Sequence, residues 1–270
     1  MQLKINDHAL HYDDFGEGPA VLLIHGFPLS RQMWKPQVEP LVDAGFRVIL
    51  PDLRGFGESD GGGSALQMDD FADDLVQLLD YLGIGQVVVG GMSMGGYVLF
   101  NLLERYPDRC VGAMFIVTRA AADDEGGRQK RSDMIDAIQS GHAQIVPDTF
   151  ANVLFADATP ATDPNLVTEV RGWMERTSPQ GLVGGLVAMR ERTDYADRLG
   201  QFRLPSLVVG ADQDKAIPLP HYQALVDGLP EAEGTVIVGA GHLVNLEKPA
   251  PFNRALLRFL EQFNQNADIR

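Results

Sequence analysis

The fold of this chain is decided by the stretch Gln86-Val-Val-Val-Gly90-Gly91-Met92-Ser93-Met94-Gly95-Gly96-Tyr97. Its β-branched beginning predicts a buried strand, and the apolar residues after Tyr97 recur at helical spacing. Ser93 lies at the turn between strand and helix, in the pattern G-x-S-x-G. A serine on such a turn takes strained dihedral angles, and side chains at Gly91 or Gly95 would collide with the neighbouring chain. The stretch therefore predicts Ser93 as a nucleophile; the alternative is a glycine-rich turn with an exposed serine.

Other short apolar runs predict further strands of the same sheet. Each is bounded by glycine, proline or aspartate and is too short for a helix: Ala20–Ile24, Arg47–Leu50, Gln86–Val89, Met114–Val117, Ser206–Val209 and Thr235–Val238. The segments Leu3–Ile5 and Ala9–Asp14 are expected to form an antiparallel pair at an edge. Helical patterns separate several of these strands, and this alternation predicts a mostly parallel sheet covered by helices on both faces.

The alternation stops between Arg119 and Gly200, where no strand is predicted. Four helical segments, with prolines at their joints, fill this stretch instead: roughly Gly126–Ser140, Ile145–Phe155, Asn165–Arg176 and Pro179–Arg190. We therefore expect an all-helical insertion that leaves the sheet after the strand Met114–Val117. The chain then divides into a core, residues 1–118 and 200–270, and a helical cap, residues 119–199.

Polar residues with catalytic potential follow three more of the predicted strands. His25-Gly26-Phe27-Pro28 follows the first, Asp212 and Asp214 follow Ser206–Val209, and His242 follows Thr235–Val238. The carboxyl ends of parallel strands meet at one edge of a sheet, where sites in such folds collect. The chain order Ser, Asp, His is that of the α/β-hydrolase triad.

These segments together resemble the α/β-hydrolase family, and they span nearly the whole chain. The matching segments are His25-Gly-Phe-Pro, Pro51-Asp-Leu-Arg-Gly-Phe-Gly-Glu-Ser59, Gly91-Met-Ser-Met-Gly-Gly96, Asp214-Lys-Ala-Ile-Pro218 and Gly239-Ala-Gly-His-Leu-Val-Asn-Leu-Glu-Lys-Pro249. The resemblance implies an eight-stranded sheet with a helical cap inserted after the sixth strand. It also implies hydrolase chemistry with no metal and no organic cofactor.

Carried over position by position, the resemblance makes Ser93 the nucleophile and His242 the general base. Two residues are candidates for the triad acid. Asp214 fits the family pattern Asp-x-x-x-Pro through Pro218, whereas Asp212 lies closer to the strand end. We favour Asp214 and leave the choice open.

The resemblance also implies that the backbone N–H groups of Phe27 and Met94 form the oxyanion hole. An apolar pocket for the acyl or alcohol group is expected between core and cap. Its candidate residues lie in or beside the motifs or in the cap: Trp34, Met92, Phe150, Leu154 and Trp173. The equally weighted alternative is that the cap residues only pack cap helices together.

Several further polar residues receive structural interpretations. His25 is expected to orient the oxyanion loop, and Glu247 to support the loop of His242. Arg119, just past the sixth strand, would either meet an anionic substrate group or form a salt bridge at the hinge, which is favoured. Two further groups are expected to be structural, namely the turn residues Asp52, Arg54 and Glu58 and the solvated helix face Asp69, Asp70, Asp73 and Asp74. The histidines His8, His11, His142 and His221 are expected at the surface or in structural roles.

Charge and cysteine content limit the partners and the compartment. The 270 residues include 37 acidic and 22 basic ones, for a net charge of −15. A field of this sign disfavours nucleic acid and anionic membranes, and it slightly disfavours strongly anionic substrates unless a local cation such as Arg119 offsets it. Cys110, the one cysteine, is expected to be a small buried hydrophobe. With neither a signal peptide nor a membrane span recognised, we expect a cytoplasmic protein.

The expected function is that of a serine hydrolase acting on carboxylic esters or lactones of small, mostly apolar compounds. A serine at position 93 disfavours alkyl–enzyme ester chemistry, which needs a carboxylate nucleophile. Alternatives within the enzyme class are an enol-lactonase-like or a perhydrolase activity, and outside it a slow-turnover ligand receptor. No cofactor and no metal are expected, the partner is a small-molecule ester or lactone, and a homo-oligomer is left open.

Overall fold

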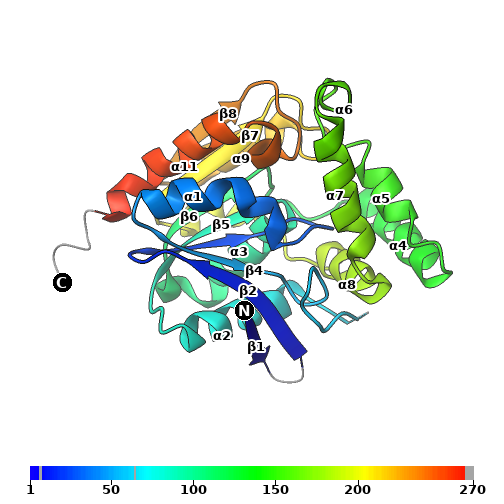
Figure 1. The fold of residues 1–270 in the computed structure, drawn as a ribbon, viewed down its shortest axis with the longest axis horizontal. Coiled ribbons are helices and arrows are strands. Elements are labelled where there is room, and N and C mark those ends of the chain that lie inside the picture. Colours follow the sequence, from blue (N-terminus) through cyan, green and yellow to red (C-terminus); the bar gives the residue numbers. More distant parts are fainter. Residues whose placement is uncertain (6–7, 64, 265–270) are drawn as a thin grey trace.

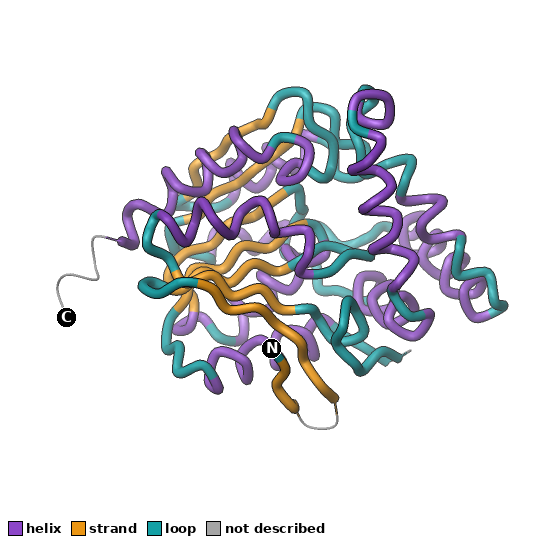
Figure 2. The backbone as a smooth tube through the Cα atoms, in the orientation of Figure 1, coloured by secondary structure: helices purple, strands orange, loops and turns teal. Residues whose placement is uncertain are grey.

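An eight-stranded sheet crosses the molecule (Figures 1 and 2), in a computed structural model that describes residues 1–5, 8–63 and 65–264. The strand order is β1-β2-β4-β3-β5-β6-β7-β8. β2 pairs antiparallel with β1 and with β4, and the other neighbours are parallel. The strands are β1 Gln2–Ile5, β2 His8–Phe15, β3 Ala20–Ile24, β4 Arg47–Pro51, β5 Val87–Met92, β6 Cys110–Ile116, β7 Ser206–Ala211 and β8 Ala232–Ile237. The predicted mostly parallel sheet and its antiparallel edge are therefore confirmed.

Several strands are longer than the sequence indicates, and β5 and β6 show why. β5 continues through Gly90 and Gly91 to Met92, because these residues still pair with Met114, Phe115 and Ile116 of β6. β6 begins at Cys110 and runs through Gly112, although glycine weakens a strand pattern. A Cβ atom at Gly112 would lie 2.5 Å from the ring of Phe263, so only glycine lets the C-terminal helix lie this close to the strand.

Helices cover both faces of the sheet, as predicted. On one face lie α1 (Lys35–Asp43) and α11 (Pro249–Asn264), and on the other α2 (Met68–Tyr81), α3 (Met94–Arg105) and α9 (Leu219–Gly228). Alternate residues of β3 divide between the two resulting cores: Val21 and Leu23 face the first, Leu22 and Ile24 the second. The chain also forms three short 3₁₀ helices among the described residues: η1 Arg31–Trp34, η2 Pro107–Arg109 and η3 Ala196–Gln201. Each face thus buries its own hydrophobic cluster.

A helical insert lies between β6 and β7, on the right in Figure 1. Its helices are α4 Glu125–Gln139, α5 Ile145–Phe150, α6 Thr159–Thr162, α7 Pro164–Arg176 and α8 Pro179–Arg190. α5 ends five residues earlier than predicted and α6 was not predicted. The reason is that Leu154 and Ala156 bond to the core: the Leu154 carbonyl accepts from Leu243 N at 3.1 Å, and Ala156 N donates to Glu247 at 2.9 Å.

The predicted solvated face of α2 is wrong at one position. Asp74 is fully buried, and its carboxylate accepts from Arg54 Nε at 2.6 Å and lies 3.1 Å from His8 Nε2. The residue shares a helix side with Phe71 and Leu75, and its charge is compensated by the arginine from the turn after β4. A run of aspartates therefore includes one buried ionic anchor as well as exposed carboxylates.

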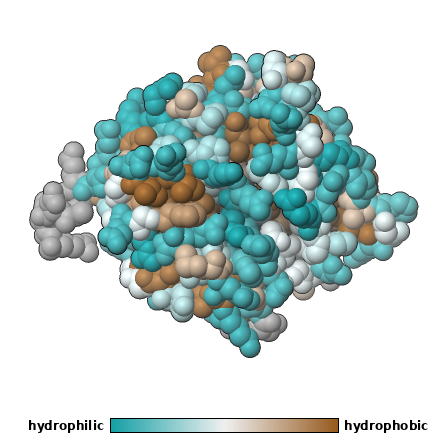
Figure 3. Space-filling model, in the orientation of Figure 1, coloured by the Kyte–Doolittle hydropathy of each residue, from teal (hydrophilic) through white to brown (hydrophobic). Residues whose placement is uncertain are grey.

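Four further observations concern the predictions on membrane, metal, cysteine and surface. In the described part of the chain, no helix is long and apolar enough to cross a membrane, and no group of three or more His, Cys, Asp or Glu residues could hold a metal ion. Cys110 is buried, and burial raises the pKa of its thiol to about 12. The face drawn in Figure 3 is largely hydrophilic, with apolar residues in separate patches.

Candidate active site

Ser93 lies on a strained turn between β5 and α3. Its φ is 52° and its ψ −113°, a region that non-glycine residues rarely adopt. Hydrogen bonds hold the turn from both sides: Ser93 N donates to the Ile116 carbonyl at 3.0 Å, and Thr118 Oγ1 donates to the Ser93 carbonyl at 2.8 Å. The neighbouring strand and its following loop thus support a conformation that the serine alone would not keep.

The flanking glycines are required by close backbone contacts. A Cβ atom at Gly91 would lie 2.3 Å from the Gly95 carbonyl oxygen, and one at Gly95 would lie 2.4 Å from the Ile24 carbonyl oxygen. Real Cβ atoms do not approach backbone this closely, so the chain would have to shift. The G-x-S-x-G spacing therefore has the physical reason that the sequence suggested.

His242 pairs with Asp214. The imidazole Nδ1 lies 2.7 Å from Asp214 Oδ2, and the two residues are 3% and 7% exposed. The other carboxylate oxygen of Asp214 accepts from the backbone N–H groups of Ala216 and Ile217 at 2.8 and 2.9 Å. Because an ionised carboxylate only accepts hydrogen bonds, Nδ1 carries the proton and the Nε2 lone pair is left to act as a base.

Asp212 has a different environment. It is exposed, and its Oδ1 accepts from Gly239 N at 2.7 Å. This bond joins the loop after β7 to the loop after β8, three residues before His242. The sequence left both aspartates as candidates for the partner of His242. In the structure Asp214 pairs with the histidine, and Asp212 connects the two loops instead.

The loop after β3 lies against Ser93. A Cβ atom at Gly26 would be 3.4 Å from Ser93 Cβ, which places the next residue, Phe27, beside the serine. Met94 is the first residue of α3, so its N–H is one of those without a partner inside the helix. The two backbone groups assigned to an oxyanion hole thus belong to segments on either side of Ser93.

His25 braces this loop. Its Nδ1 lies 3.0 Å from the Gly26 carbonyl, and its Nε2 accepts from Leu53 N at 3.0 Å. Burial lowers the pKa of His25, in spite of the nearby Asp52 carboxylate. A neutral imidazole that donates from Nδ1 and accepts at Nε2 satisfies both bonds, whereas a protonated one would not. The structure thus gives His25 the contacts of a residue that orients the loop.

The turn after β4 is held by a buried carboxylate. Asp52 accepts from the backbone N–H groups of Arg31 at 2.7 Å and Glu58 at 2.9 Å, and its carboxylate pairs with the Arg31 guanidinium. Arg31 also pairs with Glu58 and with Asp13. These contacts are structural, as expected. The part played by Arg31 was missed, since a lone arginine after Ser30 carries no motif.

Glu247 joins the His242 loop to the helical insert. One carboxylate oxygen accepts from Gly241 N at 2.9 Å, and the other accepts from Ala156 N at 2.9 Å and Thr159 Oγ1 at 2.5 Å. Support for the His242 loop was expected from the sequence. The bonds to residues of the insert were not, because nothing in the local pattern relates positions about ninety residues apart.

The residues proposed for a substrate pocket divide into two groups. Phe150 is partly buried and its ring packs against Phe27, with centroids 5.3 Å apart. The other four are buried members of one hydrophobic cluster, with at most 8% exposed: Trp34, Met92, Leu154 and Trp173. Within it Trp34 stacks on Phe252 of α11 at 6.4 Å, and its indole Nε1 has no hydrogen-bond partner among the described residues. Phe150 is thus the member placed to reach a ligand beside Phe27.

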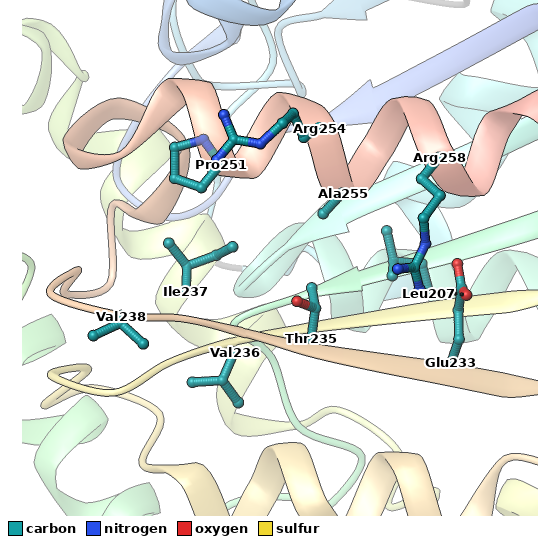
Figure 4. A pocket seen from close by; sticks show the side chains of 10 residues that line it. All are labelled: Leu207, Glu233, Thr235, Val236, Ile237, Val238, Pro251, Arg254, Ala255 and Arg258. Atoms are coloured by element: carbon teal, nitrogen blue, oxygen red, sulfur yellow. Dashed lines mark hydrogen bonds and ion pairs between the residues drawn. The ribbon is translucent and has the colours of Figure 1, made fainter.

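A cavity of about 710 Å³ opens between the insert and the loops that follow β6 and β7. Its lining includes Phe150, Leu186 and Ala216, and on the polar side Arg119 and Arg131. Two lining residues contact the candidate site: Ala216 N donates to Asp214, and the Phe150 ring packs against Phe27. A second hollow of about 460 Å³ lies between β8 and α11, lined by residues such as Ile237, Arg254 and Arg258 (Figure 4).

The chain is similar to known proteins over most of its length. The family model for the α/β hydrolase fold matches residues 19–249. The chain is 30% identical over 273 residues to a 2-hydroxy-6-oxo-6-phenylhexa-2,4-dienoate hydrolase from Comamonas testosteroni, with 96% of this chain and 93% of that protein covered. It is 29% identical to a non-heme chloroperoxidase from Kitasatospora aureofaciens, with coverages of 94% and 96%.

Among solved structures, a thermophilic esterase from Thermogutta terrifontis with bound malate superimposes with a TM-score of 0.91 and 36% identity, covering 95% of this chain and 94% of that one. The fold of this chain is the one that defines the class of α/β hydrolases. The chain belongs to the α/β-hydrolase fold family, and the fold expected from the resemblance, with a helical insertion after the sixth strand, is confirmed.

Proposed function

We propose that this protein is a serine hydrolase that cleaves carboxylic esters or lactones of small compounds through an acyl-enzyme on Ser93. The observation that carries the proposal is the hydrogen bond between His242 Nδ1 and Asp214 Oδ2, whose atoms are 2.7 Å apart. A nucleophile on an elbow and a histidine oriented by a carboxylate are the parts that serine catalysis needs.

In the proposed reaction, Ser93 Oγ attacks the carbonyl carbon while His242 Nε2 takes its proton. The carbonyl oxygen gains negative charge, which the N–H groups of Phe27 and Met94 stabilise. His242 then gives the proton to the leaving alcohol, and the acyl group stays on Ser93. A water molecule activated by His242 attacks the acyl-enzyme and restores the serine. Asp214 keeps the imidazole in its tautomer and stabilises the imidazolium.

Ester cleavage is favoured over other reactions of relatives by the esterase named above, which shares 36% of its residues with this chain. The dienoate hydrolase and the chloroperoxidase have lower identities of 30% and 29%. A lactonase-like activity uses the same acyl transfer, so lactones belong to the same proposal. A perhydrolase-like activity would require peroxide to replace water in the second half of the reaction.

The proposal is tested with a panel of p-nitrophenyl esters of increasing acyl length, with lactones and an anilide alongside, on the wild type and Ser93→Ala. We expect ester turnover in the wild type and a loss on the order of 10³–10⁶-fold in Ser93→Ala, since triad members act as a unit. Ser140→Ala, at the exposed end of α4, is the matched control. Ester turnover that survives in Ser93→Ala at the wild-type rate would overturn the proposal.

A fluorophosphonate probe separates enzyme from receptor. One adduct on Ser93 in the wild type, and none in Ser93→Ala, is expected for an activated nucleophile. Absence of labelling together with tight binding of a small ligand would instead support a slow-turnover receptor.

A further inference from the structure

Three guanidinium groups share one buried carboxylate at the base of the insert. Asp123 forms ion pairs with Arg119 and Arg131, and Arg192 Nη2 lies 3.0 Å from its Oδ1. Burial alone would raise the pKa of Asp123, but hydrogen bonds from Arg192 and Arg131 hold it at about 2. The carboxylate is therefore ionised, and one negative charge faces three positive ones.

The three arginines differ in how far their donors are used. Arg192 is buried, donates to the carbonyls of Met189 at 2.6 Å and Ala121 at 2.9 Å, and its guanidinium lies 4.2 Å from the centre of the Tyr97 ring. Arg119 has one hydrogen bond, to Asp123, and its buried Nε, like that of Arg192, has no partner among the described residues. Arg119 therefore keeps donor capacity that this cluster does not satisfy.

Arg119 and Arg131 line the 710 Å³ cavity, and Lys130 of α4 adds a third positive charge to it. Two exposed carboxylates also border the cavity and already accept hydrogen bonds: Asp124 from Gly127 N and Asp133 from Gln129 Nε2, both at 2.7 Å. Asp123 lines the cavity as well, so three positive and three negative side chains balance there, whereas the whole chain has a net charge of −15.

The rest of the cavity lining is apolar. Met134 comes from α4, Ile145 and Phe150 from α5, and Leu186 from α8. Phe150 lies against Phe27, which connects the apolar part of the lining to the loop after β3. A cavity that joins apolar side chains to arginines with unused donors suits a ligand with an apolar chain and an anionic group at its far end.

We propose that the substrate carries a carboxylate remote from the scissile bond and that Arg119, supported by Arg131 and Lys130, binds it. The substrate class is then a half-ester of a dicarboxylic acid, or a lactone that bears a carboxylate. Its chain would run along Phe150 and Leu186. This inference rests on the ester hydrolysis proposed above and assigns a specificity to it. Arginine suits the role because its planar group binds carboxylate through paired hydrogen bonds.

The test compares two esters of equal length, mono-p-nitrophenyl glutarate and its neutral methyl p-nitrophenyl diester. The measured quantity is the ratio of kcat/KM for the anionic ester to that for the neutral one. We expect Arg119→Gln to lower this ratio about tenfold, as hydrogen bonds to charged groups are worth roughly 1.5–3 kcal/mol. Arg254→Gln, in the hollow between β8 and α11 (Figure 4), is the matched control and should keep the wild-type ratio.

An unchanged ratio in Arg119→Gln would overturn the inference. So would an equal fall for both esters, because this would show that Arg119 only holds the insert through Asp123. Lys130→Gln removes an exposed charge that has no part in the Asp123 cluster, and it should lower the ratio about two- to threefold without unfolding the insert.

Binding without turnover separates this inference from the proposed function. We expect glutarate to bind Ser93→Ala in calorimetry, and about tenfold more weakly when Arg119→Gln is added. If the wild type cleaved no ester yet glutarate bound in this manner, the hydrolase proposal would fail and the carboxylate site would stand. Ester cleavage with no glutarate binding and no preference for the anionic ester would leave the hydrolase and overturn the site.

Discussion

The carboxylate of Glu247, in the core, accepts a hydrogen bond from the hydroxyl of Thr159, in the helical insert, at 2.5 Å. The same carboxylate holds Gly241 N, next to His242, and Ala156 N in the insert. One side chain thus ties the loop of the candidate base to the helical insert. We therefore expect a movement of the insert at this point to reach the backbone beside His242.

Replacing Glu247 should therefore affect stability and turnover together. The two carboxylate oxygens of Glu247 accept three hydrogen bonds, whereas the Glu247→Gln side chain has only one acceptor oxygen. At least one buried donor therefore loses its partner, at a cost of about 1–3 kcal/mol. We expect a matching fall in the free energy of unfolding, measured in urea, and a lower kcat for a p-nitrophenyl ester.

Thr159→Val is the matched change on the other side of this contact. It keeps the side-chain shape but removes only the hydroxyl, so it should cost about 1 kcal/mol and leave the bond to Gly241 in place. If Glu247→Gln destabilised the protein no more than Thr159→Val and left kcat unaltered, the coupling between insert and His242 loop would be refuted.

The two aspartates after β7, Asp212 and Asp214, allow the triad assignment to be tested by comparing kcat of two similar variants. Asp214→Asn removes the acceptor that fixes the His242 tautomer, and we expect kcat to fall about 10⁴-fold, the size seen for such a change in a serine protease. Asp212→Asn keeps an oxygen that can accept from Gly239 N, so kcat should change less than threefold. Steady-state kinetics on one activated ester is sufficient. Equal losses in both variants would contradict the assignment of Asp214.

Much of this site could be predicted from sequence because its parts follow strands. Ser93, Asp214 and His242 each come just after an apolar run, and parallel strands bring their ends to one edge whatever lies between them. The core helices were predictable for a similar reason, since their apolar faces repeat every three to four residues.

Contacts made across long sequence separations could not be predicted. The pairings of Glu247 with Thr159 and of Asp74 with Arg54 depend on how separate elements pack, which no local pattern encodes. The same limit applies to the cluster around Asp123. The sequence indicated that Arg119 forms a salt bridge at the hinge or contacts the substrate. That it shares the Asp123 carboxylate with Arg131 and Arg192 follows only from the folded insert.

The close packing around the elbow predicts a steric effect. Gly91→Ala would place a methyl group 2.3 Å from the Gly95 carbonyl oxygen, which is backbone and cannot rotate away. We expect a loss of about 1–3 kcal/mol in stability and a strong fall in kcat, because the turn that presents Ser93 must shift. Gly85→Ala, where the added methyl meets no atom within 4 Å, is the control. Thermal unfolding and ester kinetics of the two variants check this, and wild-type behaviour of Gly91→Ala would contradict it.

The buried His25 predicts how stability depends on pH. Burial lowers its pKa below the ordinary value of 6.5, so between that lower pKa and 6.5 the unfolded chain binds a proton that the folded one does not. Stability from this residue is therefore complete above about pH 6.5 and is lost as the pH falls toward the folded-state pKa. Urea unfolding at several pH values between 7 and 5 should show the free energy of unfolding falling with pH.

His25→Asn removes this titration, so its unfolding free energy should fall less steeply over the same interval, whatever its value at pH 7. A residual slope is expected from His221, whose pKa is also lowered, first by burial and then by the charge of Arg119. His221→Asn in the same background should flatten the curve further. A slope in His25→Asn as steep as that of the wild type would mean that His25 binds its proton at the same pH in the folded protein as in the unfolded chain. Its bond from Leu53 N would then have to be reassigned, because an imidazolium has no lone pair to accept it.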